Sequence, residues 1–235
     1  MQALILAGGL GMRLRPVVFD RPKPMAPVAG VPFLERLLGW LGRQGVTEVV
    51  LCVGYRWEAI RAALGEGARW GVSIRYSVEE TPLGTAGALK HAEPLAAETF
   101  FVLNGDTFVD VHLPALAAFH RQKQALGTLT LVEVEDARPY GTVHADPSGR
   151  LQAFAEKNTA ASPSKGWVNA GLYRFERALL HWIPGSRPVS LERETLPALA
   201  RAGEALYGYF HQGYFIDIGT PEHYAKSQEE LKERL

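Results

Sequence analysis

Glycines and basic side chains lie close together in the first thirty residues, MQALILAGGLGMRLRPVVFDRPKPMAPVAG. Gly8, Gly9 and Gly11 follow an apolar run, where glycines let a backbone approach a ligand and turn successive N–H groups towards an anion. Arg13 can bind two phosphate oxygens at once, and Lys23 stands between two prolines that restrict the backbone around it. The pattern predicts a polyphosphate site; the alternative is a glycine-rich turn with solvated basic residues.

Other glycine-rich nucleotide loops fit this stretch poorly. The dinucleotide fingerprint G-x-G-x-x-G must open a helix, but the chain has no third glycine at the required place and Pro16 interrupts the segment. The G-x-x-x-x-G-K-[ST] loop is absent from the sequence. A nicotinamide- or flavin-dependent oxidoreductase is therefore disfavoured.

Two aspartates further along the chain stand where a metal could bind. Asn104-Gly105-Asp106 ends a predicted buried strand, and ligands of open α/β sheets bind at the carboxyl ends of strands. Asp217 lies among apolar residues just before a predicted helix, where a carboxylate is costly unless it is paired or metal-bound. Carboxylate oxygens suit Mg²⁺. For either aspartate alone, a turn or helix-capping role fits equally well.

Alternating strands and helices would position these residues. Apolar runs predict strands at 3–7, 47–53, 72–78 and 100–103, and helical spacing predicts helices over 32–41, 57–64 and 85–97. In the second half we predict strands at 127–134, 141–145, 151–156, 167–175 and within 207–218, and helices over 190–202 and from 221. The order predicts a doubly wound α/β fold in a single domain, with a nucleotide-binding half (1–125) and a second binding half (126–235).

Composition sets limits on location and partners. The chain has 235 residues, of which 47% are hydrophobic and 21% charged, a composition that is typical of a globular protein. Its net charge is zero, which indicates neither a nucleic acid nor a membrane as partner. The single cysteine, Cys52, excludes an internal disulfide and a cysteine-based zinc site. No apolar run resembles a signal peptide or a membrane-spanning helix, so we predict a cytoplasmic protein. A homo-oligomer is left open.

Taken together, the motifs resemble those of the sugar-1-phosphate nucleotidylyltransferases. Residues 8–14 match the family pattern G-G-x-G-x-R-L, and residues 22–30 match P-K-P-M-x-P-V-x-G. Residues 80–87 resemble the base-binding segment, most closely that of mannose-type guanylyltransferases. The N-terminal stretch looks closest to D-glycero-D-manno-heptose 1-phosphate guanylyltransferases, although members commonly have Thr where Met12 stands.

The resemblance implies a Rossmann-like mixed sheet, the nucleotide-diphospho-sugar transferase fold, without a C-terminal β-helix. It implies transfer of a nucleotidyl group from a nucleoside triphosphate, GTP by this likeness, to a manno-configured sugar 1-phosphate with release of pyrophosphate. The open alternatives are a uridylyltransferase for glucose or N-acetylamino-sugar 1-phosphate and a regulatory protein that binds nucleotide-sugars without turnover.

The resemblance also assigns roles to residues of this chain. It implies that Arg13, Lys23 and Asp106 are catalytic residues and that Asp106 and Asp217 bind Mg²⁺. The nucleotide would be bound by Leu6, Ala7, Gly8, Gly9, Gly11, Met12, Arg13, Glu80, Pro82, Gly84 and Thr85. The sugar phosphate would be bound by Asn104, Tyr140, Gly141, Glu156, Lys157, Asn169 and Gly171.

Overall fold

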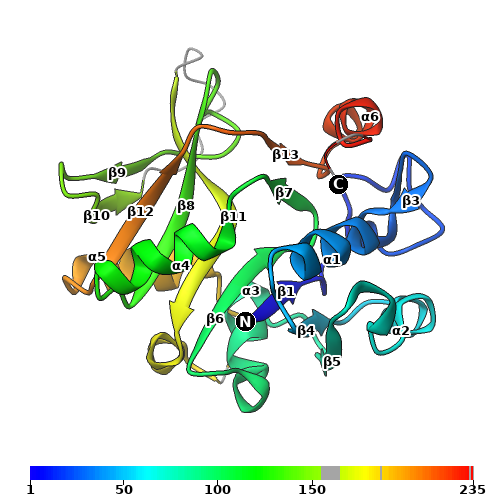
Figure 1. Cartoon of the computed structure of the whole chain (residues 1–235), viewed down its shortest axis with the longest axis horizontal. Coiled ribbons are helices and arrows are strands. Elements are labelled where there is room, and N and C mark those ends of the chain that lie inside the picture. Colours follow the sequence, from blue (N-terminus) through cyan, green and yellow to red (C-terminus); the bar gives the residue numbers. More distant parts are fainter. Residues whose placement is uncertain (155–164, 186, 233, 235) are drawn as a thin grey trace.

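A seven-stranded mixed sheet forms the centre of the computed structural model, which describes residues 1–235 except 155–164, 186, 233 and 235 (Figure 1). The strand β11 runs antiparallel to both of its neighbours, and the other adjacent pairs are parallel. In spatial order the strands are β12 (Leu206–His211), β8 (Gly127–Val134), β11 (Gly166–Glu176), β6 (Thr99–Asn104), β1 (Gln2–Leu6), β4 (Glu48–Val53) and β5 (Ser73–Val78). The predicted mixed, doubly wound sheet is confirmed.

Helices cover both faces of the sheet. On one face lie α1 (Phe33–Arg43), α2 (Trp57–Leu64) and α4 (Leu113–Gln122), and on the other lie α3 (Gly84–His91) and α5 (Leu196–Arg201) (Figure 1). The four leucines that predicted the first helix, Leu34, Leu37, Leu38 and Leu41, are fully buried against the sheet. Gly45 follows α1 at φ +83°, the left-handed conformation that commonly ends a helix.

Several elements differ from the sequence-based expectation. No element was expected between residues 107 and 126, where the structure has the short strand β7 (Thr107–Val109) and α4. The helix expected over 85–97 ends at His91, and Pro94 sits in a separate 3₁₀ turn (Glu93–Leu95). The helix expected over 190–202 is a π turn (Leu191–Thr195) followed by α5, because Pro197 has no N–H for a regular helical hydrogen bond.

Three small two-stranded sheets accompany the central one. The strands β9 (Val143–Ala145) and β10 (Leu151–Phe154) form a hairpin around the predicted turn at 146–149. The strands β2 (Pro27–Val28) and β3 (Val31–Pro32) form a second hairpin, directly after a 3₁₀ turn (Lys23–Met25). The region 207–218 splits, so that β13 (Phe215–Asp217) pairs with β7 outside the central sheet.

The strand order places one topological switch point beside β1. The chain builds β1, β4 and β5 outward in one direction and then returns to place β6 on the other side of β1. Leu6 and Asn104, at the carboxyl ends of these two strands, are register partners, and the Gly105 N–H donates to the Leu6 carbonyl at 2.9 Å. This edge is where open α/β sheets bind ligands.

The helix α6 (Pro221–Glu230) is the last element of the described chain. It begins as predicted, with Thr220 accepting a hydrogen bond from the His223 N–H at 3.3 Å and with Pro221 in the first position. Among the described residues no helix is both long and apolar enough to cross a lipid bilayer.

Candidate active site

A cavity of about 430 Å³ lies at the carboxyl ends of β1 and β6; we call it the loop cavity. Its wall contains every residue assigned to the nucleotide except Glu80, that is Leu6, Ala7, Gly8, Gly9, Gly11, Met12, Arg13, Pro82, Gly84 and Thr85. Glu80 is exposed, and its neighbour Glu79 lines the cavity instead. Cys52 lies at the same wall, and burial raises the pKa of its thiol to about 12.

Two positions of the first loop lie so close to neighbouring side chains that they must be glycine. Gly11 has φ +62°, and a Cβ on it would lie 2.9 Å from Cβ of Lys23. A Cβ on Gly8 would lie 2.5 Å from Oε1 of Glu79. The loop can therefore pack against the lysine and the glutamate only because it carries no side chains at these positions.

The segment that opens α3 forms the facing wall. Gly84 adopts φ +74°, and a Cβ on it would lie 2.5 Å from the carbonyl oxygen of Val189. The Glu79 carboxylate accepts a hydrogen bond from the Leu83 N–H at 3.1 Å and so fixes this turn. Partial burial raises the pKa of Glu79 above its ordinary value.

The two aspartates are brought together by the β7–β13 pair. Asp217 is the register partner of Thr107, and the Ile218 N–H donates to the Asp106 carbonyl at 2.8 Å. A third segment contributes Lys23, whose ammonium forms an ion pair with the Asp106 carboxylate and whose side chain is 11% exposed.

Gly219 marks the point around which the charged groups gather. A Cβ on this residue would lie 2.7 Å from Oδ1 of Asp217, 3.1 Å from Nζ of Lys23 and 3.3 Å from Nη2 of Arg13. The Gly219 N–H donates to the same Asp217 oxygen at 2.7 Å. We call Arg13, Lys23, Asp106 and Asp217 the charged cluster.

The other two basic residues of the opening stretch have different surroundings. Arg21 pairs with the adjacent Asp20 at 2.6 Å, and both side chains are about half exposed. The Arg15 guanidinium lies over the Tyr55 ring, 5.7 Å from its centroid. Neither residue lines either of the two cavities described here.

A second cavity of about 540 Å³, the strand-end cavity, adjoins the first. Its wall contains Asn104, Tyr140, Gly141, Asn169 and Gly171 from the residues assigned to the sugar phosphate, together with Asp106 and Asp217. Glu156 and Lys157 lie outside the described residues. Burial and the Asp217 carboxylate both raise the pKa of the Tyr140 hydroxyl.

Sequence reasoning missed Glu192, which also lines the strand-end cavity. Its carboxylate accepts hydrogen bonds from the Thr85 hydroxyl at 2.8 Å and from the Tyr173 hydroxyl at 3.3 Å. Asn169 in turn donates its side-chain amide to the Tyr173 hydroxyl at 2.9 Å. A polar network therefore connects the start of α3 with the strand-end cavity.

The two cavities share one wall, formed by Arg13, Gly84, Thr85, Asn104 and Asp106. Ligands in the two compartments would meet beside the charged cluster, whose two cations can hold anionic groups. Among the described residues no group of three or more His, Cys, Asp or Glu side chains could hold a metal ion. Two carboxylates nevertheless suit Mg²⁺, which usually binds one or two protein carboxylates and takes its other ligands from water and substrate phosphates.

Comparison with known proteins identifies the family of this chain. The sequence profile of the family described as "Nucleotidyl transferase" matches residues 2–234. The chain belongs to the nucleotidyl transferase family. A D-glycero-alpha-D-manno-heptose 1-phosphate guanylyltransferase from Aneurinibacillus thermoaerophilus is 40% identical over 99% of this chain and 99% of its own length.

Other relatives agree with this family membership. A mannose-1-phosphate guanylyltransferase from Mycobacterium tuberculosis is 41% identical over 98% of this chain, which spans 64% of that protein's length. The crystal structure of HddC from Yersinia pseudotuberculosis complexed with GMP-PN superposes with a TM-score of 0.86 at 32% identity, covering 98% of this chain and 99% of that one. The structural match confirms the nucleotidyl transferase fold expected from the sequence.

Proposed function

We propose that this nucleotidyl transferase is a guanylyltransferase that joins GTP to a manno-configured sugar 1-phosphate, of heptose or mannose, and releases pyrophosphate. The observation that carries the proposal is the shared wall of the two cavities at the charged cluster. The names of the two relatives with 40% and 41% identity support the base and the sugar. In this proposal residues 1–125 supply most of the nucleotide site, and residues 126–235 supply most of the sugar-phosphate site.

The proposed reaction needs positioning and charge neutralisation more than proton transfer. A phosphate oxygen of the sugar 1-phosphate, already deprotonated near neutral pH, attacks the α-phosphorus of GTP, and the bond to pyrophosphate breaks. Arg13 holds the departing β- and γ-phosphates, and Lys23 neutralises charge that develops at the α-phosphoryl oxygens. Asn104, Tyr140 and Asn169 orient the sugar phosphate from the strand-end cavity. The assignment of Lys157 to its phosphate rests on the family resemblance alone, because this residue lies outside the described residues.

A divalent metal fits the carboxylates of the charged cluster. We propose that Asp106 and Asp217 hold Mg²⁺, which would supply positive charge to the phosphate oxygens. Asp217→Asn should then weaken binding of Mn²⁺, a paramagnetic substitute, as followed by water proton relaxation. Unchanged Mn²⁺ affinity in this variant would contradict the assignment.

Base recognition is assigned to Glu79 together with Pro82, Gly84 and Thr85. A carboxylate in the cavity wall accepts hydrogen bonds, and guanine presents N–H donors that other bases place differently. Glu80 takes part in the sequence-based assignment, but its exposed position favours Glu79 for the contact. The cytoplasmic location is part of this proposal, since nucleoside triphosphates are abundant there; homo-oligomerisation stays a prediction.

A substrate panel tests the function directly. Pyrophosphate release should be measured with each of four nucleoside triphosphates against mannose, manno-heptose, glucose and N-acetylglucosamine 1-phosphates. We expect the highest kcat/KM with GTP and a manno-configured sugar. A preference for UTP with glucose or N-acetylglucosamine 1-phosphate would replace this proposal by a uridylyltransferase, and binding without turnover of any pair would favour a regulatory protein.

A further inference from the structure

The hairpin that follows Lys23 is held from outside by the last helix. Gln228 on α6 accepts a hydrogen bond from the Ala29 N–H at 2.9 Å and donates one to the Pro27 carbonyl at 3.0 Å. The Tyr224 hydroxyl donates to the same carbonyl at 2.6 Å. The side-chain amide of Gln228 thus pairs with residues two apart in the backbone, as a neighbouring β-strand would.

The hairpin needs such support because its turn is unfavourable. Ala29 has φ +47° and Gly30 has φ +79°, so an alanine occupies the left-handed region that normally favours glycine. Arg36 on α1 donates to the Val28 carbonyl at 2.8 Å and holds the hairpin from a second element. The conformation therefore depends on contacts from two helices, α1, which directly follows the hairpin, and α6, whose Gln228 lies 199 residues after Ala29 in sequence.

The segment between Lys23 and the hairpin is held rigidly, so that a displacement of the hairpin also displaces the lysine. Prolines at 22, 24 and 27 fix backbone angles on both sides of the lysine. The Ala26 N–H donates to the Lys23 carbonyl at 3.0 Å, and the Phe33 N–H donates to the Ala26 carbonyl at 3.0 Å. A shift of Pro27 would therefore move Lys23 instead of being absorbed by the chain.

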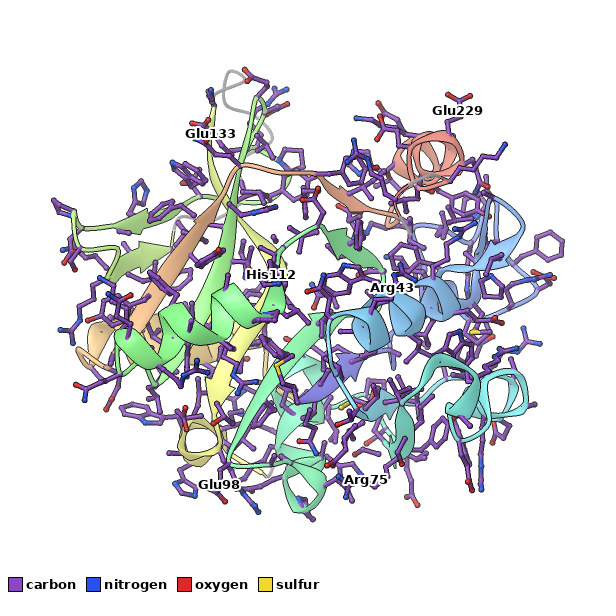
Figure 2. All side chains as sticks on the ribbon, viewed as in Figure 1. Arg43, Arg75, Glu98, His112, Glu133 and Glu229 are labelled. Atoms are coloured by element: carbon purple, nitrogen blue, oxygen red, sulfur yellow. The ribbon has the colours of Figure 1, made fainter. Side chains whose placement is uncertain are left out.

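The same helix is joined to the other side of the charged cluster. It begins at Pro221, two residues after Gly219, and is joined by this short loop to β13, the strand that ends with Asp217. Figure 1 shows α6 between β13 and the hairpin that contains β3. Its opposite side is solvated, and Figure 2 shows Glu229 pointing away from the rest of the molecule.

We infer that α6 sets the position of Lys23 relative to Asp217, with Gln228 and Tyr224 as positioning residues that act through the backbone of residues 27–29. The inference rests on the proposed function, because it takes Lys23 to act on the transferred phosphoryl group. Loss of the Gln228 contacts should move the lysine, which lines the loop cavity, while the parts of the cavity wall that other segments supply stay in place. The effect should then fall on kcat more than on KM.

Kinetics of Gln228→Leu and Tyr224→Phe test the inference. A misplacement of about 1 Å can cost up to about 100-fold in rate, so we expect kcat to fall about tenfold in Gln228→Leu and about threefold in Tyr224→Phe, with smaller changes in KM for GTP. Tyr214→Phe is the matched control, because it removes a different α6 contact, the 2.8 Å hydrogen bond from the Tyr214 hydroxyl to Glu230. It should leave kcat unchanged, as should Glu229→Gln.

A double-mutant cycle separates positioning from general destabilisation. If Gln228 acts through Lys23, Gln228→Leu should lower kcat by less than about twofold in a Lys23→Ala background. A tenfold loss in both backgrounds, or a loss of equal size in Tyr214→Phe, would overturn the inference.

Hydrogen exchange measured by mass spectrometry gives a readout that needs no activity. Exchange over residues 22–30 should be faster in Gln228→Leu than in the wild type or in Tyr214→Phe. Unchanged exchange would refute the role of α6 even in an active enzyme. If the wild-type protein releases no pyrophosphate, the proposed function fails, whereas the exchange result still decides whether Gln228 orders the lysine segment.

Discussion

Gly219 offers a sharp test of the charged cluster, because the structure leaves no room there for a methyl group. A Cβ would lie 2.7 Å from Oδ1 of Asp217 and 3.1 Å from Nζ of Lys23, whereas ordinary contacts lie at 3.4–4 Å. The charged ends would have to withdraw by roughly 0.5–1 Å, and displacements of about this size in an active site cost up to about 100-fold. We expect Gly219→Ala to lower kcat/KM by about 10- to 100-fold, or about 1.4–2.7 kcal/mol.

The same substitution should leave folding nearly unchanged. The backbone of Gly219 does not lie in the left-handed region, so alanine meets no conformational penalty. Replacing glycine removes about 0.4–1 kcal/mol of unfolded-state entropy, which offsets the displacement of flexible side-chain ends. The melting temperature should therefore stay within about 4 °C of the wild type.

Steady-state pyrophosphate release and thermal unfolding measure the two expectations together. Gly185→Ala is the control, since a Cβ at this exposed glycine would meet nothing within 4 Å. It should change neither kcat/KM nor the melting temperature appreciably. An active, stable Gly219→Ala enzyme with kcat/KM within about twofold of the wild type would refute our account of the cluster.

Three further predictions concern single side chains. Lys23→Ala should lower kcat by about 100-fold or more, because a preorganised cation for developing charge is lost; a change confined to KM in the same assay would count against this role. Glu79→Gln should raise KM for GTP by about tenfold, the size of one lost charged hydrogen bond, whereas Glu80→Gln should leave KM unchanged; equal effects of the two variants in parallel titrations would contradict the assignment of Glu79. Burial lowers the pKa of His120 below its ordinary value, so the unfolded chain binds a proton more readily and the free energy of unfolding should fall as the pH drops from about 7 towards 5. Urea unfolding of His120→Gln should show a smaller fall over this range, and an identical fall would exclude His120 as its source.

Local patterns were sufficient to predict the first half of the site. An apolar strand followed by glycines predicts the end of β1, and the motif at 104–106 predicts the end of β6. Parallel pairing then brings the two ends together, because Leu6 and Asn104 share a register. The amphipathic spacing of Leu113, Leu116, Ala117 and His120, all buried on α4, is a similar local signal and indicates this helix as well.

Strand pairing and contacts between segments distant in sequence determine the parts of the site that local patterns could not predict. Adjacent glutamates at 79 and 80 have the same chemistry, and side chains that follow a strand alternate in direction, so which one faces the cavity depends on the pairing of β5 with β4. The Glu79 N–H continues this pairing by donating to the Val53 carbonyl at 2.9 Å. Glu192 lies in a segment that reads as an ordinary helix, and its role depends on a hydrogen bond to Thr85, 107 residues away in sequence.

The charge balance of the cluster explains why nucleotide affinity and catalysis should depend on different residues. Arg13, Lys23 and Asp217 lie around Gly219, and Asp106 pairs with Lys23, so a triphosphate must compete with Asp106 for the ammonium of Lys23. Part of the attraction is offset by the loss of that ion pair, which limits what Lys23 can contribute to ground-state binding. The backbone N–H groups of the glycine loop carry no net charge to be neutralised, and they are better suited to bind the phosphates before reaction. Lys23 would then contribute most when charge accumulates at the α-phosphoryl group, which is why its removal should affect kcat more than KM.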